Sequence, residues 1–205
     1  MRLRSFILFS MMSCTAINAF SQGADSTRWE IGLEANNYFI PGNYILDPVV
    51  TANHNKLHLE ARYNYEDLRT LSAWAGYNFH WTKKVDFAFT PMVGIVLGNT
   101  QGIAPGFEFD FNYRKFEIYS ETEYLLDTGD KNASFYYNWT DITYNLKEWL
   151  WFGMSIQRTR LYRSELELQK APLVGFQLKK WQLTTYGFDL GTGSAFVLVT
   201  LGRDF

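Results

Sequence analysis

Apolar and polar residues alternate along almost the whole chain after its first few dozen residues. From Leu57 to Tyr65 every second residue is apolar, and the residues between them are polar or charged. A period of two places successive side chains on opposite faces of a β-strand, whereas a helix repeats every 3.6 residues. Similar apolar rows recur over 85–97, 107–113, 150–156, 174–178 and 197–201. The pattern therefore predicts an all-β protein.

The predicted strands are about ten residues long, which exceeds the usual length in globular sheets and suits a tilted strand that crosses a membrane. Counted back from the C-terminus, they cover 195–205, 181–190, 169–179, 149–160, 134–146, 116–126, 102–113, 85–97, 69–81, 56–66, 44–52 and 28–39. Single-chain bacterial barrels have even strand numbers because both termini lie in the periplasm. We therefore predict a transmembrane antiparallel up-and-down β-barrel of about 12 strands. The alternative is about 10 strands, if marginal segments such as 44–52, which contains Pro48, drop out.

Short basic turns fix the expected registers of neighbouring strands. They lie at 82–84, 114–115, 147–149 and 179–180. The registers that follow pair Tyr113 with Phe116, Leu178 with Trp181, Trp81 with Val85, and Leu146 with Leu150. Aromatic residues cluster beside these turns, as in the girdle at a membrane interface, and most connections at the opposite strand ends are longer or more polar. This asymmetry is typical of outer-membrane barrels, whose short turns are periplasmic.

The N-terminal segment has the features of an export signal. Basic residues precede a short apolar run, and Ala19 and Ser21 place small side chains at −3 and −1 of a cleavage point. We expect residues 1–21 to be a cleavable signal peptide and residues 22–205 to form a single barrel domain. An N-terminal anchor and lipoprotein processing at Cys14 are the alternatives.

Composition excludes several other classes of protein. The chain has 205 residues and a net charge of −2, so a nucleic-acid partner is not expected. Its hydrophobic residues make up 47% of the chain, but they form no uninterrupted run long enough for a membrane-spanning helix. With a single cysteine, the chain cannot be a disulfide scaffold.

The last six residues, Thr200 to Phe205, resemble the C-terminal signature of bacterial outer-membrane β-barrel proteins. A polar residue, a glycine and a terminal aromatic follow alternating apolar positions, although Arg203 stands where an apolar residue is more typical. The resemblance is to the class and not to one family. It implies localisation in the bacterial outer membrane, contact with outer-membrane lipids, and recognition of the strand ending at Phe205 by the barrel-assembly machinery. A soluble β-sandwich, with its apolar rows buried inward, is the alternative.

If the apolar rows face lipid, the polar face of each strand lines the lumen. The pore-lining residues expected on this basis are Glu60, Arg62, Glu108, Asp110, Glu117, Tyr119, Glu121 and Glu123, and the same face carries Glu30, Glu34, His58 and Asp86. The register set by the turn at 114–115 places Glu108 opposite Glu121 and Asp110 opposite Tyr119. Two facing carboxylates require a cation, an arginine from across the barrel, or a shared proton.

Four arginines are candidate partners for the acidic strip: Arg62, Arg69, Arg158 and Arg160. Strict alternation from Phe152 turns Arg158 and Arg160 toward lipid. That orientation is expected only at the outer rim or after a bulge.

Three functions remain open. The favoured one is a small porin-like channel or transporter for small polar or cationic solutes, because acidic pore linings favour cations. The second is a closed structural or adhesive barrel, plugged by a salt-bridged interior, whose loops at 127–133 and 161–168 bind partners. The third is an outer-membrane lipid-modifying enzyme, which would need a serine and a histidine on neighbouring strands.

Catalysis and metal binding both depend on the histidines, of which there are three: His54, His58 and His80. Pairing residue 66 with residue 70 places His58 opposite Asn78 and Ser72 opposite Asn64, so no serine meets a histidine. His80 lies beside a predicted periplasmic turn, the wrong end for lipid chemistry. We expect no catalytic residues and no cofactor. We also expect no metal site, because no cysteine remains after export and the histidines do not cluster.

Overall fold

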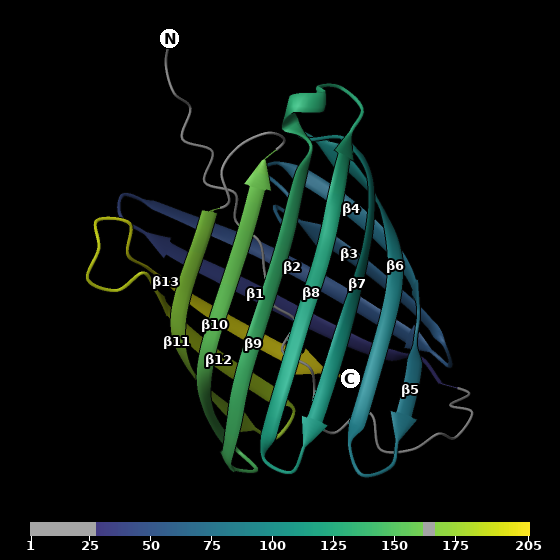
Figure 1. Ribbon diagram of the computed structural model, residues 1–205, viewed down its shortest axis with the longest axis vertical. Helices are drawn as coiled ribbons and strands as arrows, with labels where there is room; N and C mark the ends of the chain where they lie inside the picture. The colour runs from purple at the N-terminus through teal and green to yellow at the C-terminus, as the bar shows by residue number, and fades with distance from the viewer. Residues whose placement is uncertain (1–27, 162–166) are drawn as a thin grey trace.

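The computed structural model, which describes residues 28–161 and 167–205, is a single antiparallel sheet closed into a barrel (Figure 1). Its strands follow one another around the barrel in chain order, and β1 pairs with β13 to close it. The strands are β1 (Glu30–Ile40), β2 (Asn43–His54), β3 (Leu57–Tyr63), β4 (Thr70–Tyr77), β5 (Phe79–Thr82), β6 (Asp86–Gly98), β7 (Gly102–Tyr113), β8 (Phe116–Asp127), β9 (Phe135–Lys147), β10 (Leu150–Leu161), β11 (Glu167–Leu178), β12 (Trp181–Phe188) and β13 (Phe196–Asp204).

The barrel has 12 strands, as the alternation predicts. β4 and β5 both pair with β6, so they are two halves of one barrel strand interrupted at Asn78. β2 includes the marginal segment 44–52, and its pairing with β1 continues through Pro48. The described residues contain one short 3-10 helix, η1 (Lys131–Ala133), and no helix long and apolar enough to span a membrane. The expected signal peptide and Cys14 lie outside the described residues.

The apolar rows of the strands face outward. On β6, Val93, Ile95 and Leu97 are 50–59% exposed, whereas Met92 and Val96, which alternate with them, are buried. The aromatic residues beside the short turns, among them Trp81, Trp149 and Trp181, are also exposed on the outside. A soluble sandwich would bury these rows, so that alternative is wrong, and the rows form the outer surface of the barrel.

The two ends of the barrel differ in their connections. One end, here called the turn end, carries the connections 55–56, 83–85, 114–115, 148–149 and 179–180, together with the start of β1 and the end of β13. The opposite end, here called the loop end, carries 64–69, 99–101, 128–134 and 189–195, and one short turn at 41–42. Figure 1 shows η1 at the top of the view and the tight turns at the bottom. The segment 162–166, which includes most of a predicted partner-binding loop, lies outside the described residues.

Two of the predicted registers are confirmed at their turns. Tyr113 lies opposite Phe116 and Leu178 lies opposite Trp181. Arg114 and Lys179, the first residues of these turns, have positive φ, a feature of tight hairpin turns whose twist matches that of the strands. Because these registers hold, the carboxylates of Glu108 and Glu121 are on directly opposed residues.

Two other turn registers are wrong by small steps. Trp81 lies opposite Phe87 and not Val85, because the connection is 83–85. That shift of two residues leaves the same side chains facing outward. Leu150 lies opposite Lys147, and a bulge next to the turn then restores the expected register along the rest of β9 and β10.

The predicted pairing of β3 with β4 is also wrong by two residues. His58 lies opposite Gly76 and not Asn78, and Ser72 lies opposite Arg62. The cause is the connection 64–69, which begins with a positive φ at Asn64 and leaves the ladder earlier than expected. Because the error is an even number of residues, the inward-facing row on β3 is unchanged.

Candidate functional site

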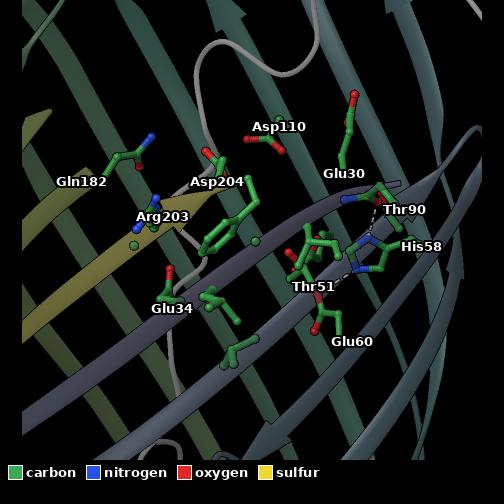
Figure 2. A pocket seen from close by; sticks show the side chains of 18 of the residues that line it. Glu30, Glu34, Thr51, His58, Glu60, Thr90, Asp110, Gln182, Arg203 and Asp204 are labelled. Carbon is green, nitrogen blue, oxygen red and sulfur yellow. Dashed lines mark hydrogen bonds and ion pairs between the residues drawn. The ribbon is translucent and has the colours of Figure 1, made fainter. Parts of the chain in front are cut away.

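A cavity of about 450 Å³ occupies the turn-end half of the barrel interior. Its mouth is formed by Glu30, Lys179, Lys180 and Asp204, and its innermost wall by Arg62, Tyr65 and Glu121. Figure 2 shows carboxylates converging on this space from several sides, with Glu30, Glu34 and Glu60 on strands near the N-terminus and Asp110 on β7. We refer to it as the carboxylate cavity.

Arg62 is the central cation of the carboxylate cavity. It is almost fully buried, and its guanidinium contacts three carboxylates. Nη1 lies 2.7 Å from Oε1 of Glu121 and 3.5 Å from Oε2 of Glu123, and the other guanidinium nitrogens bind Oε2 of Glu60. Glu60 is on the same strand as Arg62, whereas Glu121 and Glu123 are on β8, and three barrel strands, β4, β6 and β7, lie between β3 and β8. The arginine therefore crosses the lumen, which is one of the three arrangements that the facing carboxylates require.

Two aromatic rings hold the Arg62 guanidinium in place. Its carbon lies 4.1 Å from the centre of the Tyr65 ring and 4.6 Å from that of Trp74, distances at which cation–π attraction operates. The Tyr65 hydroxyl donates to Glu121, and the Trp74 indole N–H lies 3.1 Å from Oε1 of Glu66. Four of the groups that touch Arg62, namely Glu60, Glu121, Tyr65 and Trp74, thus have a second polar contact, which holds this part of the network in place.

The Trp74 ring fits only because the neighbouring strand has a glycine beside it. A Cβ atom at Gly94 would lie 2.5 Å from the Trp74 ring atoms. Gly175 plays the same part for Trp151 on the other side of the barrel, where a Cβ would lie 2.0 Å from the ring. Large aromatic side chains therefore lie flat against the inner wall instead of pointing along the axis.

His58 extends the network toward the mouth. Its Nε2 lies 2.7 Å from Oε1 of Glu60, and its Nδ1 lies 2.8 Å from Oδ1 of Asn53. The same Asn53 oxygen accepts from the side-chain amide of Asn78, which in turn accepts from the hydroxyl of Thr90. Asn78 faces inward in alternation with Ser72 and Trp74, so it joins this chain of hydrogen bonds where β4 gives way to β5.

The structure places every expected pore-lining residue inside the barrel, but not all of them reach the carboxylate cavity. Five line it: Glu60, Arg62, Glu108, Asp110 and Glu121. Glu117, Tyr119 and Glu123 are buried in the barrel but do not line the cavity. The Tyr119 hydroxyl donates to Oε1 of Glu108 at 2.8 Å, so it holds a carboxylate that does line the cavity.

Two of the other candidate arginines do not balance the acidic strip. Arg69 is exposed in the connection 64–69, and Arg158 is exposed on the outward face of β10 near the loop end. Alternation alone therefore gives the correct orientation of Arg158, at a rim position that a charged side chain tolerates. The side chain of Arg160 lies outside the described residues.

The sequence pattern does not predict every inward carboxylate. Those it leaves out include Asp47, Glu66 and Asp141, which are all buried. Both carboxylate oxygens of Asp47, and one each of Glu66 and Glu123, accept no hydrogen bond within the described part of the chain. Burial raises the pKa of the Glu66 carboxyl, which lies in the connection 64–69. Buried acids in excess of their cationic partners make the interior favourable for protons and other cations.

The loop-end half of the interior is packed by an aromatic plug, which comprises Tyr38, Trp139, Tyr186, Phe188 and Phe196. Phe188 and Phe196 are stacked with ring centres 4.7 Å apart, and Trp139 meets both Tyr186 and Phe188 edge to face. Tyr38 on β1 contacts Phe196 on β13, so the plug links the two strands whose pairing closes the barrel. These side chains are buried, so the plug fills the interior beside β1, β9, β12 and β13 toward the loop end.

The surroundings of His58 differ from the serine–histidine pair that a lipid-modifying enzyme would need. The ring nitrogens of His58 are engaged by Asn53 and Glu60, and the residue opposite it on β4 is Gly76. Within the described residues, no serine hydroxyl is hydrogen-bonded to His58. A lipid-modifying enzyme would also need its histidine to face lipid near the outer rim, whereas His58 lies inside near the turn end.

Solved structures with this fold include porins of low sequence similarity. KdgM porin has a TM-score of 0.62 and 9% sequence identity, over 85% of this chain and 98% of that chain, and so has KdgM porin in complex with disordered oligogalacturonate. A chain from a study of in-meso crystallization of membrane proteins has a TM-score of 0.55 and 11% identity, over 86% of this chain and 83% of that one. No family model and no curated protein matches the sequence. The likeness shows the fold, which is that of an outer-membrane porin barrel.

Proposed function

We propose that this protein is a porin-like channel of the bacterial outer membrane that passes small polar and cationic solutes. The observation that carries the proposal is the carboxylate cavity inside a closed 12-stranded barrel. Its volume of about 450 Å³ is in the range of small-molecule sites. Carboxylates along a narrow aqueous path favour cations, as acidic rings do in cation channels.

The charge of the cavity lining distinguishes this proposal from a channel for acidic sugars. KdgM porin forms a complex with an oligogalacturonate, whose sugar units carry carboxylates. In the cavity described here, the deep cation Arg62 is already bound by Glu60, Glu121 and Glu123. An anionic solute would meet unfavourable carboxylates and compete with these ion pairs. Its exclusion therefore follows from the same contacts that favour cations.

The aromatic plug lies on the path that a solute would take through the barrel. We expect passage from the turn end to the loop end to require movement of the rings around Phe188. This plug favours a second candidate function, a closed structural barrel whose loops bind partners. The two candidates differ in one property, because only a channel lets solutes cross a membrane.

A liposome-swelling assay tests the proposal. Proteoliposomes with the refolded protein are diluted into isotonic solutions of lysine, glycine or glutamate, and the loss of turbidity is followed. The channel predicts swelling in the order lysine, glycine, glutamate. Equal, absent or reversed swelling would contradict it, and absent swelling would favour the closed barrel.

The outer surface of the barrel suits two kinds of partner. We propose that outer-membrane lipids cover the exposed apolar rows and that the barrel-assembly machinery recognises β13. The Arg203 guanidinium lies 4.8 Å from the centre of the Trp181 ring and 4.5 Å from that of Phe205. Stacking on these rings lets the arginine side chain occupy a position where an apolar residue is more typical.

A further inference from the structure

Three side chains of the metal-binding types meet in the wall of the carboxylate cavity. One ligand atom each from His58, Glu60 and Glu108 lies within 4.8 Å of the other two. His58 and Glu60 are two residues apart on β3, whereas Glu108 comes from β7. Because β4 and β6 separate these strands, the cluster exists only through the curvature of the closed barrel.

Each of the three side chains is oriented by a separate polar contact. Asn53 Oδ1 accepts a hydrogen bond from His58 Nδ1, which leaves Nε2 directed at Glu60. Arg62 binds Oε2 of Glu60 and leaves Oε1 facing His58. The Tyr119 hydroxyl holds Glu108. Metal-binding histidines and carboxylates typically have such outer contacts, which fix the ring orientation and the carboxylate rotamer.

Charge and access also suit a cation. Within the described residues, no lysine or arginine forms an ion pair with Glu108, while Glu60 shares Arg62 with Glu121 and Glu123. All three cluster side chains line the carboxylate cavity, so an ion has a path to them from the turn end. Figure 2 shows His58 and Glu60 facing this space.

We propose that His58, Glu60 and Glu108 form a binding site for a divalent transition-metal ion, with Zn²⁺ as the best fit. One imidazole and two carboxylates are a donor set that zinc accepts, whereas Ca²⁺ and Mg²⁺ prefer six or more oxygen ligands. Bonds of about 2.0–2.1 Å in a tetrahedron place ligand atoms about 3.3 Å apart. Small side-chain rotations therefore suffice to close the present cluster around an ion. The ion would replace the hydrogen between His58 Nε2 and Glu60, and its fourth position would face the cavity.

The site does not depend on transport, so it is tested by binding. The full chain is refolded in detergent, treated with chelator and titrated with ZnCl₂ or CaCl₂ in a calorimeter. We expect one Zn²⁺ per barrel and much weaker binding of Ca²⁺. His58→Gln and Glu108→Gln should each weaken Zn²⁺ binding at least about tenfold. The matched comparison is Asp110→Asn, on the same strand and face as Glu108, which removes a cavity carboxylate outside the cluster and should weaken Zn²⁺ binding clearly less than Glu108→Gln does.

Two further measurements keep the test decisive. Cobalt substituted for zinc should give visible absorption bands typical of low-coordinate Co²⁺, and Glu108→Gln should remove them. In the unmodified protein, Zn²⁺ should slow acylation of His58 by diethylpyrocarbonate, read by mass spectrometry, without protecting His54, which is partly exposed at the end of β2. The proposal is overturned if the protein binds no Zn²⁺, if Asp110→Asn weakens binding as much as Glu108→Gln, or if His58 is not protected.

Discussion

Arg62 on β3 and Glu121 on β8 form an ion pair across the barrel interior, with 2.7 Å between Nη1 and Oε1. These two strands are separated by three others in the wall, so the contact ties opposite sides of the barrel together. It also satisfies one of the two carboxylates that face each other across β7 and β8. The other, Glu108, is left to the Tyr119 hydroxyl, and this imbalance underlies both the proposed cation preference and the proposed metal site.

Replacing Arg62 by methionine should destabilise the barrel by about 3–5 kcal/mol, because the buried Glu60, Glu121 and Glu123 lose the guanidinium that they share. The free energy of unfolding is measured by urea titration in detergent, followed by tryptophan fluorescence and by the heat-dependent shift on gels. Arg69→Gln, at an exposed arginine, is the control and should change this free energy by less than about 0.5 kcal/mol. Equal effects of the two substitutions would mean that the network contributes nothing specific.

Gly94→Ala should destabilise the protein by about 1–3 kcal/mol, because the new methyl group would overlap the Trp74 ring. Combining it with Trp74→Leu should cost less than the sum of the two single changes, since the smaller side chain leaves room for the methyl group. Gly193, whose Cβ would meet nothing within 4 Å, provides the control Gly193→Ala. Additive effects in the double variant would show that the ring does not lie against Gly94.

An arginine at Val93, in the middle of the outward face of β6, should reduce folding stability in lipid bilayers by about 2–4 kcal/mol. The same substitution at Leu178, an exposed residue beside a short turn, should cost about 0–1 kcal/mol because it lies at the interface. Folding equilibria in bilayers of one composition give both values. If Val93→Arg costs no more than Leu178→Arg, the outward apolar rows do not face hydrocarbon.

The aromatic plug should limit conduction. Phe188→Ala removes the ring that joins Phe196 to Trp139, and we expect a higher single-channel conductance together with a stability loss of about 3–5 kcal/mol. Phe176→Ala removes a ring of the same size from the outward face of β11, and it should leave the conductance unchanged. Equal conductance of the two variants would place the constriction elsewhere.

The architecture could be predicted from sequence because the strand period and the turns are local signals. Tyr113 and Phe116 flank a two-residue turn, so their pairing follows from chain geometry alone. Even 44–52 proved to be a strand, although both of its faces are largely apolar. That same lack of alternation is why the buried Asp47 could not be assigned to the interior.

The site was less predictable because it depends on contacts between strands that are not neighbours. The register of β3 with β4 differs from the predicted one because nothing in the sequence shows that Tyr65 and Glu66 fold into the lumen. The approach of Glu108 to His58 depends on the curvature of the barrel, which alternation does not specify. The aromatic plug does not follow from the sequence pattern, because β9 carries aromatic residues on both faces around Trp139.

The ion selectivity of the reconstituted protein tests the central claim most directly. In planar bilayers under a KCl gradient, we expect a reversal potential of the sign for a cation-selective pore. Substituting Gln for both Glu108 and Glu121 should move the reversal potential toward zero, whereas Glu148→Gln, in an exposed turn, should leave it unchanged. Anion selectivity, or no conductance from a correctly folded barrel, would contradict the account.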